Sequence, residues 1–474
     1  MLSKGLEELN RKYYEKYFLL IIGMLLFSTI CFYYVDISSN VRQGINFWKA
    51  LFEGNFFKYY SINHESYLAE EMSHHANYSM MTNFIMAIWQ FPLYLIEVIW
   101  NINTQSYFIF RIYSKLYLLI VAYFTANQIY NIGMKLKLDK EKSSMLKIFF
   151  LTSGVMCVSV CLDAQIEIIS LFMMLKAIEY AIRGDKKKFL IWYILSFQCK
   201  YFAVFALIPI LLYIEKKIKI LFIEVILPFV VHFIVQYPFN YFDPIGVSYC
   251  STFITTFESL FVPSIRICEL NIPLSIILYV LLCLCSFFKS NEVVNRNDWI
   301  IYLASLAPFC FINAYMVPYR MVMLVPLILI LLFLKSDDIK TIILFETSME
   351  VLLILFGLFR TTWCYDYSAM NGMLLDIILP FKKFELFSMS TIKENLSDMV
   401  ELVQGGILAL FLGICVYIFI IFYPERKCKR FVVCYDLSET KLFVGRSILC
   451  FGLANIYILF YGFSVIRNII LHFL

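Results

Sequence analysis

The chain has 474 residues, of which 61% are hydrophobic and only 16% are charged. A soluble globular protein needs more polar surface than this, so the composition excludes that class. Apolar segments long enough to cross a bilayer recur from one end to the other, which predicts an all-α polytopic membrane protein. The net charge of +5 says little by itself, but the distribution of the basic residues is informative.

Thirteen apolar segments are candidate transmembrane helices. The first follows a basic segment and ends at Asp36 instead of a small-residue cleavage site, so we interpret it as a retained signal-anchor. The predicted spans are residues 17–35, 107–130, 147–161, 165–182, 189–199, 201–214, 220–239, 273–288, 299–314, 321–334, 341–358, 404–423 and 446–466.

Basic residues indicate the orientation of these spans. Lys and Arg cluster at residues 1–16, 131–147, 183–188, 215–219 and 424–430. The positive-inside rule places these segments in the cytoplasm, with the N-terminus. We also predict that this multi-pass protein lies in the plasma membrane. The outer segments are then residues 36–83, 240–272, 315–320 and 359–403.

One further apolar segment, residues 83–100, does not fit the alternation of cytoplasmic and outer segments along the chain. It is apolar enough to cross, but a crossing would reverse the orientation of everything that follows. We therefore predict that it is re-entrant or interfacial.

An unusual pair of acids occurs in "CLDAQIEIIS", residues 161–170. Asp163 and Glu167 lie four residues apart, which predicts that they share one face of a helix. Basic loops flank this stretch on both sides, so it should form the outer tip of a hairpin. Lys200 should lie at the next outer tip, because the residues between 183–188 and 215–219 are too few for two full spans. Such short helices are tolerated in a membrane only where their tips line a polar cavity.

The first outer segment predicts an amphipathic helix that lies on the outer leaflet, over residues 41–57. Its apolar face carries Val41, Ile45, Trp48, Phe52 and Phe56. Its polar residues lie largely away from that face and are Arg42, Asn46, Lys49 and Glu53.

Six polar residues map to the same, outer side of the membrane, and ionisable residues at membrane depth indicate function. They are Asp36, Asp163, Gln165, Glu167, Lys200 and Arg320. Structural explanations remain open for the five charged residues: an interfacial position for Asp36, helix caps or an internal ion pair for the other two acids, and snorkelling for the two cations.

The combination suits one chemistry in particular. A carboxylate near the outer interface can remove a proton from a sugar hydroxyl group. A nearby Arg or Lys can bind a phosphate and neutralise the charge that it gains as a leaving group. Short hairpins and an interfacial helix could admit a lipid tail from the side. A lipid-linked sugar phosphate would use all three features.

Three stretches resemble motifs of a known family. They are "VDISSNVRQGINFWKALFEGNFFKYY" (residues 35–60), the hairpin that runs from "CLDAQIEIIS" through "RGDKKK" to "QCKYFAVFALIPILL" (residues 161–212), and "PYRMVMLVPLILI" (residues 318–330). Together they resemble the GT-C glycosyltransferases, and most closely the mannosyltransferase-like branch that uses polyprenyl-phosphate sugars. Ala164 stands where this family usually has glycine, and Glu167 where it usually has aspartate.

This resemblance implies a GT-C-like fold and an inverting transfer of a hexose from a polyprenyl-phosphate carrier. The acceptor would be a glycan, lipid or protein outside the cytoplasm. Asp36 would be the general base, and Lys200 and Arg320 would bind the donor phosphate. The residues that would orient the sugar or the acceptor are Asp163, Gln165 and Glu167. Residues 1–239 would form the catalytic module, and residues 240–474 a set of C-terminal helices.

Other interpretations remain open. A carrier or flippase for lipid-linked sugars would also use broken helices and buried acids. A polymerase or ligase of lipid-linked saccharides and a purely structural membrane protein are further alternatives. No motif indicates a cofactor or a nucleic-acid partner.

Two groups of outer residues are weaker candidates for a site. A divalent metal could be bound by His64, His74 and His75 with Glu70 or Glu71, but their spacing matches no tight metal motif and favours a solvated loop. Trp363, Tyr365 and Tyr367 could stack on a sugar, although aromatic residues there more often anchor a protein at the membrane interface.

Overall fold

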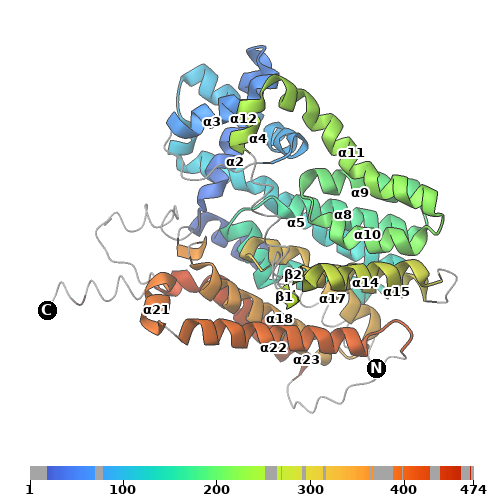
Figure 1. Ribbon diagram of the computed structural model, residues 1–474. Coiled ribbons are helices and arrows are strands. Elements are labelled where there is room, and N and C mark those ends of the chain that lie inside the picture. Colours follow the sequence, from blue (N-terminus) through green and yellow to red (C-terminus); the bar gives the residue numbers. More distant parts are fainter. Residues whose placement is uncertain are drawn as a thin grey trace.

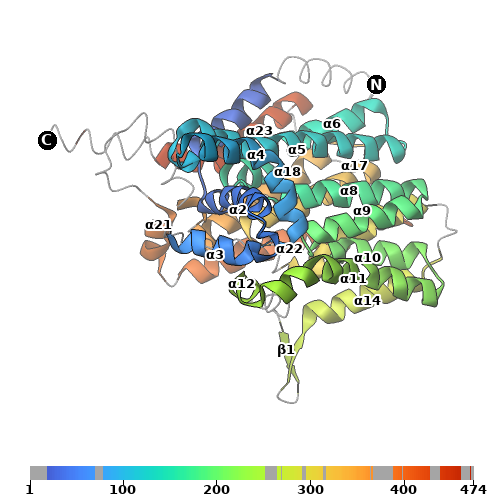
Figure 2. The ribbon, with the colours of Figure 1, turned by 90° about the horizontal axis from the view of Figure 1, so that it is seen from above.

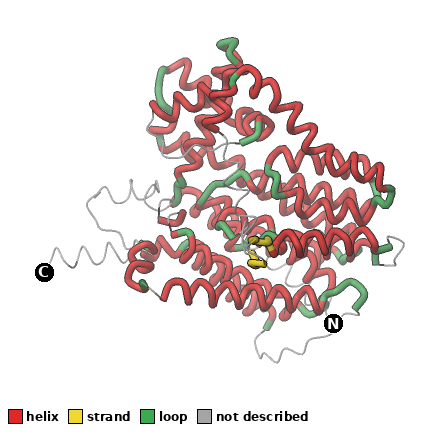
Figure 3. Tube along the Cα trace, in the orientation of Figure 1, coloured by secondary structure: helices red, strands yellow, loops and turns green. Residues whose placement is uncertain are grey.

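A computed structural model describes residues 19–69, 78–250, 264–267, 270–290, 295–312, 316–362, 364–366, 388–397, 399–426, 438–460 and 470. Almost all of this part of the chain is helical, and the strands are confined to one short hairpin (Figure 3).

The N-terminal part begins with a helix over Leu19–Cys31, which a bend of 86° separates from the next helix. The elements that follow are α2 (Val35–Phe52), η1 (Phe56–Lys58), α3 (Tyr59–Ala69), α4 (Met80–Trp100) and η2 (Thr104–Ser106).

The central part is a series of helices that run back and forth. They are α5 (Phe108–Lys135), α6 (Lys140–Leu151), α7 (Gly154–Met156), the π-helix η3 (Cys157–Leu162), α8 (Glu167–Arg183), α9 (Lys186–Cys199), α10 (Ala203–Ile214), α11 (Ile218–Phe242) and α12 (Pro244–Cys250).

The C-terminal part adds a two-stranded antiparallel hairpin and further helices. They are β1 (Ser264–Ile267), β2 (Leu270–Pro273), α14 (Leu274–Phe288), α15 (Arg296–Cys310), η5 (Pro318–Met323), α17 (Val325–Lys335), α18 (Ile339–Arg360), α21 (Met389–Leu396), α22 (Met399–Ile421) and α23 (Glu439–Ala454). The hairpin pairs Ser264 with Pro273 and, apart from Pro273 itself, lies in the predicted outer segment 240–272.

The chain has the apolar helices of an integral membrane protein. Within the described residues, six helices are long and apolar enough to cross a membrane, or up to eight if each of two bent pairs is one span. The all-α class is therefore supported, but the thirteen predicted spans are not confirmed. The difference arises because several predicted spans are short helices; α9 has 14 residues and α10 has 12. At 1.5 Å per residue each reaches about 20 Å, less than the roughly 30 Å of a bilayer core.

The helices give the bundle two distinct ends. The turns after α8 and α10, which carry basic residues, lie at the same end of the bundle, and α2, α3 and α21 lie toward the other end (Figures 1 and 2). Lys200, between α9 and α10, belongs to this second end. The two short helices and the tip position of Lys200 agree with the sequence prediction.

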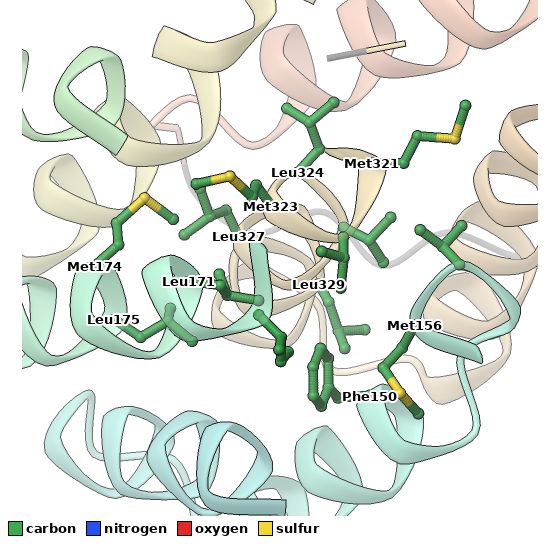
Figure 4. Packing of buried hydrophobic residues seen from close by; sticks show 14 of the residues in the cluster. Phe150, Met156, Leu171, Met174, Leu175, Met321, Met323, Leu324, Leu327 and Leu329 are labelled. Carbon is green, nitrogen blue, oxygen red and sulfur yellow. The ribbon is translucent and has the colours of Figure 1, made fainter. Parts of the chain in front are cut away.

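The centre of the bundle is the segment formed by η5 and α17. In the apolar 18-residue stretch Pro318–Lys335, 78% of the residues are buried inside the protein. The corresponding share for α11 is 11%. Figure 4 shows Met323 and Leu327 of this segment close to Met174 of α8, with Phe150 and Met156 on another side. Residues from both halves of the sequence thus contribute to one core.

Helix α4 contains residues 83–100, the apolar segment predicted to be re-entrant or interfacial. Its length and composition would permit a crossing. However, it packs chiefly on α2 and touches the bundle helices α5 and α9 only locally. In Figure 1 it is viewed nearly along its axis, whereas α8, α9 and α10 run across the page. This arrangement is compatible with the prediction that the segment does not cross.

The prediction that residues 41–57 form an amphipathic helix on the membrane surface is wrong for most of α2. The expected polar residues Arg42 and Asn46 are buried, with exposed fractions of 7% and 2%. They are covered because α3 and α4 supply polar partners. Arg42 Nη1 lies 2.8 Å from Glu97 Oε2 in α4, and Asn46 Nδ2 donates to Asn63 Oδ1 in α3 at 2.9 Å. Among the side chains of α2 whose burial is described, those at the C-terminal end, around Phe52, are exposed as expected.

Candidate functional site

A break in the chain places Asp36 near the end of the bundle toward which α2 and α3 lie. The first helix ends at Cys31, Tyr34 is extended, and α2 begins at Val35. Asp36 therefore lies in the first turn of α2, where the positive end of the helix dipole favours a carboxylate. Its side chain is partly exposed.

A second break separates the two acids of "CLDAQIEIIS". The π-helix η3 ends at Asp163, Ala164 is left-handed with φ of 48°, and α8 begins at Glu167. The prediction that Asp163 and Glu167 share one helical face is therefore wrong: the helix is interrupted between them. A left-handed residue favours glycine, which is the physical reason why glycine would be the easier residue at position 164.

The predicted site residues meet at these two breaks. Gln165 Nε2 donates to Asp36 Oδ2 at 2.8 Å. Lys200 Nζ, at the tip between α9 and α10, lies 2.9 Å from Glu167 Oε1. Residues at the break after η3 thus contact both the start of α2, through Gln165, and the turn between α9 and α10, through Glu167.

Arg320 approaches the same region from η5. Its guanidinium carbon lies 4.6 Å from the centre of the Phe202 ring, two residues beyond Lys200, and 5.6 Å from the ring of Tyr319. Cation–π contacts of this kind hold the guanidinium in place. The Tyr319 phenol lies within electrostatic range of both Asp36 and Glu167.

Asp163 also belongs to this neighbourhood. Its carboxylate and that of Asp36 both lie within electrostatic range of the Tyr34 hydroxyl. The structure therefore gathers all six residues predicted from the sequence into one region. Their roles in a reaction stay predictions.

Burial divides the six residues into two groups. Asp163, Gln165 and Glu167 are at most 1% exposed. Asp36, Lys200 and Arg320 are only partly buried. The buried residues can orient neighbouring side chains, whereas the partly buried residues are accessible to a ligand.

Tyr78 is a member of the cluster that the sequence did not indicate. Its hydroxyl donates to Gln165 Oε1 at 3.4 Å, and Lys200 Nζ lies 4.7 Å from the centre of its ring. Burial, followed by the negative charges of Glu167 and Asp36, raises the pKa of Tyr78 well above its usual value. The phenol therefore stays neutral and remains a hydrogen-bond donor.

Lys115 in α5 is the second residue that was missed. Its side chain is fully buried, and Nζ donates to the carbonyl oxygens of Thr29 at 2.8 Å, Phe32 at 2.6 Å and Cys161. It thereby ties the chain before Asp36 to the chain before Asp163. A lone lysine inside an apolar segment was the available signal. With Lys115, the region contains three acids and three cations.

The weaker candidates do not gain support. Within the described part of the chain, no group of three or more His, Cys, Asp or Glu residues could hold a metal ion. His74, His75, Glu70 and Glu71 lie outside that part, as do Trp363 and Tyr367. Tyr365 is only 1% exposed and stacks on Tyr457, so it does not face the membrane interface.

Comparison with protein-family models, with curated proteins and with solved structures finds no match to this chain.

Proposed function

We propose that the protein is a membrane glycosyltransferase of the GT-C type. It would transfer a hexose such as mannose, with inversion, from a polyprenyl-phosphate carrier to a glycan, lipid or protein acceptor. The observation that carries this proposal is the contact between Asp36 and Gln165, which orients a partly exposed carboxylate in the region that also contains the partly exposed cations Lys200 and Arg320.

The proposed reaction assigns one task to each group. Asp36 accepts the proton of the acceptor hydroxyl as that oxygen forms a bond to the anomeric carbon. The bond between the anomeric carbon and the phosphate oxygen breaks on the opposite face, and polyprenyl phosphate leaves. Lys200 and Arg320 stabilise the charge that develops on this phosphate.

The buried residues would prepare these groups. Gln165 holds the Asp36 carboxylate, and the neutral Tyr78 hydroxyl in turn donates to Gln165. Glu167 holds the Lys200 ammonium group through the ion pair at 2.9 Å. Asp163 completes the negative side of the site. This preorganisation limits the rearrangement needed when substrate binds.

The orientation of the protein belongs to the same proposal. If the basic turns lie in the cytoplasm, the end of the bundle that carries Asp36 and Lys200 lies outside the cytoplasm. The carrier would reach the site from the outer leaflet of the plasma membrane.

Sugar transfer in isolated membranes tests the proposal. Radiolabelled polyprenyl-phosphate hexoses are supplied to wild type, Asp36→Asn and Glu53→Gln at matched expression. Glu53 is the matched control, because it is an exposed acid at the other end of α2. We expect acceptor labelling in wild type and Glu53→Gln, and a loss of at least about 100-fold in Asp36→Asn, the usual size of a general-base contribution.

Other results would reject parts of the proposal. Labelling that persists in Asp36→Asn removes this residue from the mechanism. An absence of transfer with every donor, together with altered sidedness of a lipid-linked sugar, would favour a carrier instead.

A further inference from the structure

A second group of buried charges lies in the bundle, apart from the residues used above. It consists of Glu346 and Glu350 of α18 and Arg446 of α23, and we refer to it as the Glu346–Arg446–Glu350 cluster. The exposed fraction of the side chain is 0% for all three residues. Helices α18 and α23 pack against each other in the C-terminal part of the bundle (Figure 1).

Arg446 holds one of the two acids tightly. Its Nε donates to Glu346 Oε2 at 2.8 Å, and its Nη2 donates to Glu346 Oε1. This two-point geometry is the strongest form of an arginine–carboxylate pair. Arg446 Nη1 donates to the backbone oxygen of Thr152 at 3.1 Å and to the hydroxyl oxygen of the same residue, and Nη2 donates to the backbone oxygen of Phe149 at 3.0 Å.

Glu350 is placed differently. Its Oε1 lies 3.8 Å from Arg446 Nη2, too far for a hydrogen bond, and no donor reaches that oxygen. Its Oε2 accepts from the backbone N–H of Gly154 at 2.8 Å. The groups that face Glu350 are Glu346 on its own helix, Arg446 and Cys450 on α23, and Ser153 and Gly154 at the break between α6 and α7.

Charge balance decides the protonation of this cluster. Two ionised carboxylates and one guanidinium would leave a net charge of −1 in a fully buried site. Burial of an uncompensated charge is so costly that the group binds or releases a proton instead. Glu346 already has a two-point ion pair, whereas an ionised Glu350 would have an oxygen without a donor.

We propose that Glu350 binds a proton and is a neutral carboxylic acid in the folded protein at neutral pH. The cluster then has no net charge and acts as a proton-dependent clamp on the break between α6 and α7. From Gly154 the chain continues through α7 and η3 to Asp163, so the clamp holds one end of the segment that carries the candidate site. This inference does not depend on the proposed glycosyl transfer.

The proposal predicts an unusual response to mutation. In the unfolded chain, a glutamate releases its proton above a pH of about 4.3. Glu350 must then take up a proton when the chain folds. The free-energy cost of this uptake grows as the pH rises, so the stability of the folded state falls. Glutamine has the shape of the neutral acid and requires no such uptake. Glu350→Gln should therefore be at least as stable as wild type at neutral pH.

The test uses purified full-length protein in detergent. We expect the Tm of Glu350→Gln to equal or exceed that of wild type at pH 7, and the difference to increase as the pH rises from about 5 to about 8. The matched variant Glu346→Gln removes the tight partner of Arg446 and should lower Tm by about 5 °C or more. Infrared difference spectra between wild type and Glu350→Gln should show the carbonyl band of a protonated carboxylic acid in wild type only.

Two outcomes would overturn the proposal. A lower Tm for Glu350→Gln that does not depend on pH would mean that Glu350 is an ionised partner of Arg446. A carboxylic-acid band that is absent from wild type, or that Glu350→Gln retains, would mean that Glu350 holds no proton.

Discussion

Individual side chains of the candidate site depend on neighbours that no short motif contains. Asp36 lies far along the chain from Gln165, and Lys200 from Glu167, but each pair is in direct contact. The motifs identified all four residues by type and position. They did not indicate Tyr78, because a tyrosine before an apolar helix is common in membrane proteins. Lys115 lies outside the three motifs, so its position within an apolar segment was the only signal for it.

The ion pair between Lys200 and Glu167 leads to a prediction about stability. Glu167 is fully buried, so Lys200→Met would leave an unpaired buried carboxylate and should destabilise the protein by about 3–5 kcal/mol. The double variant Lys200→Met/Glu167→Gln should recover most of this loss. Thermal unfolding of the two single variants and the double variant checks the prediction, and additive losses would show that the two residues do not interact in the folded protein.

At the scale of elements, the site depends on interrupted helices. The first helix bends by 86° before α2, and η3 ends in a left-handed residue before α8. Lys115 binds carbonyl oxygens on both sides of this arrangement, from Thr29 to Cys161. Residual backbone strain and π-helical turns are often found at functional positions, where surrounding contacts maintain them.

The close approach of α7 and α23 gives a prediction for a glycine. A Cβ atom at Gly154 would lie 2.6 Å from the backbone oxygen of Cys450 and 2.7 Å from Cδ1 of Ile354. Because a backbone oxygen cannot easily move aside, Gly154→Ala should destabilise the protein by about 1–3 kcal/mol. The matched control is Gly413→Ala in α22, where a Cβ would meet no atom within 4 Å. That variant should be neutral or stabilising by up to about 1 kcal/mol. Equal Tm values for the two variants would contradict the packing seen at Gly154.

At the scale of the whole molecule, the sequence predicted the class but not the number of spans. Apolar composition and basic turns indicated an all-α membrane bundle with two different ends, and the structure has this form (Figures 1 and 2). The thirteen predicted spans are not confirmed, since six to eight helices of the described residues are long and apolar enough to cross. Hydropathy identifies an apolar helix without showing whether it runs through the bundle or across it. The same limitation applies to α2, whose polar residues are covered by α3 and α4.

The path of α4 can be tested by the sidedness of labelling. If α4 does not cross the membrane, exposed residues before it and after α5 lie on opposite sides. Glu53→Cys should then react with a membrane-impermeant maleimide in intact cells, and Lys140→Cys only after permeabilisation. Wild type controls for labelling of the native cysteines. Labelling of both variants from the same side would show that α4 crosses and that the predicted orientation after it is reversed.

The sequence by itself determined the membrane class, the short α9–α10 hairpin and the six residues of the candidate site, because these follow from composition, from charge distribution and from residue type. Only the tertiary structure decided that Asp36 contacts Gln165, that Lys115 joins two breaks and that Glu350 shares one arginine with Glu346. Such contacts join segments that are far apart in the chain. They depend on how helices pack and where they break, and a local pattern of hydrophobic and charged residues does not specify either.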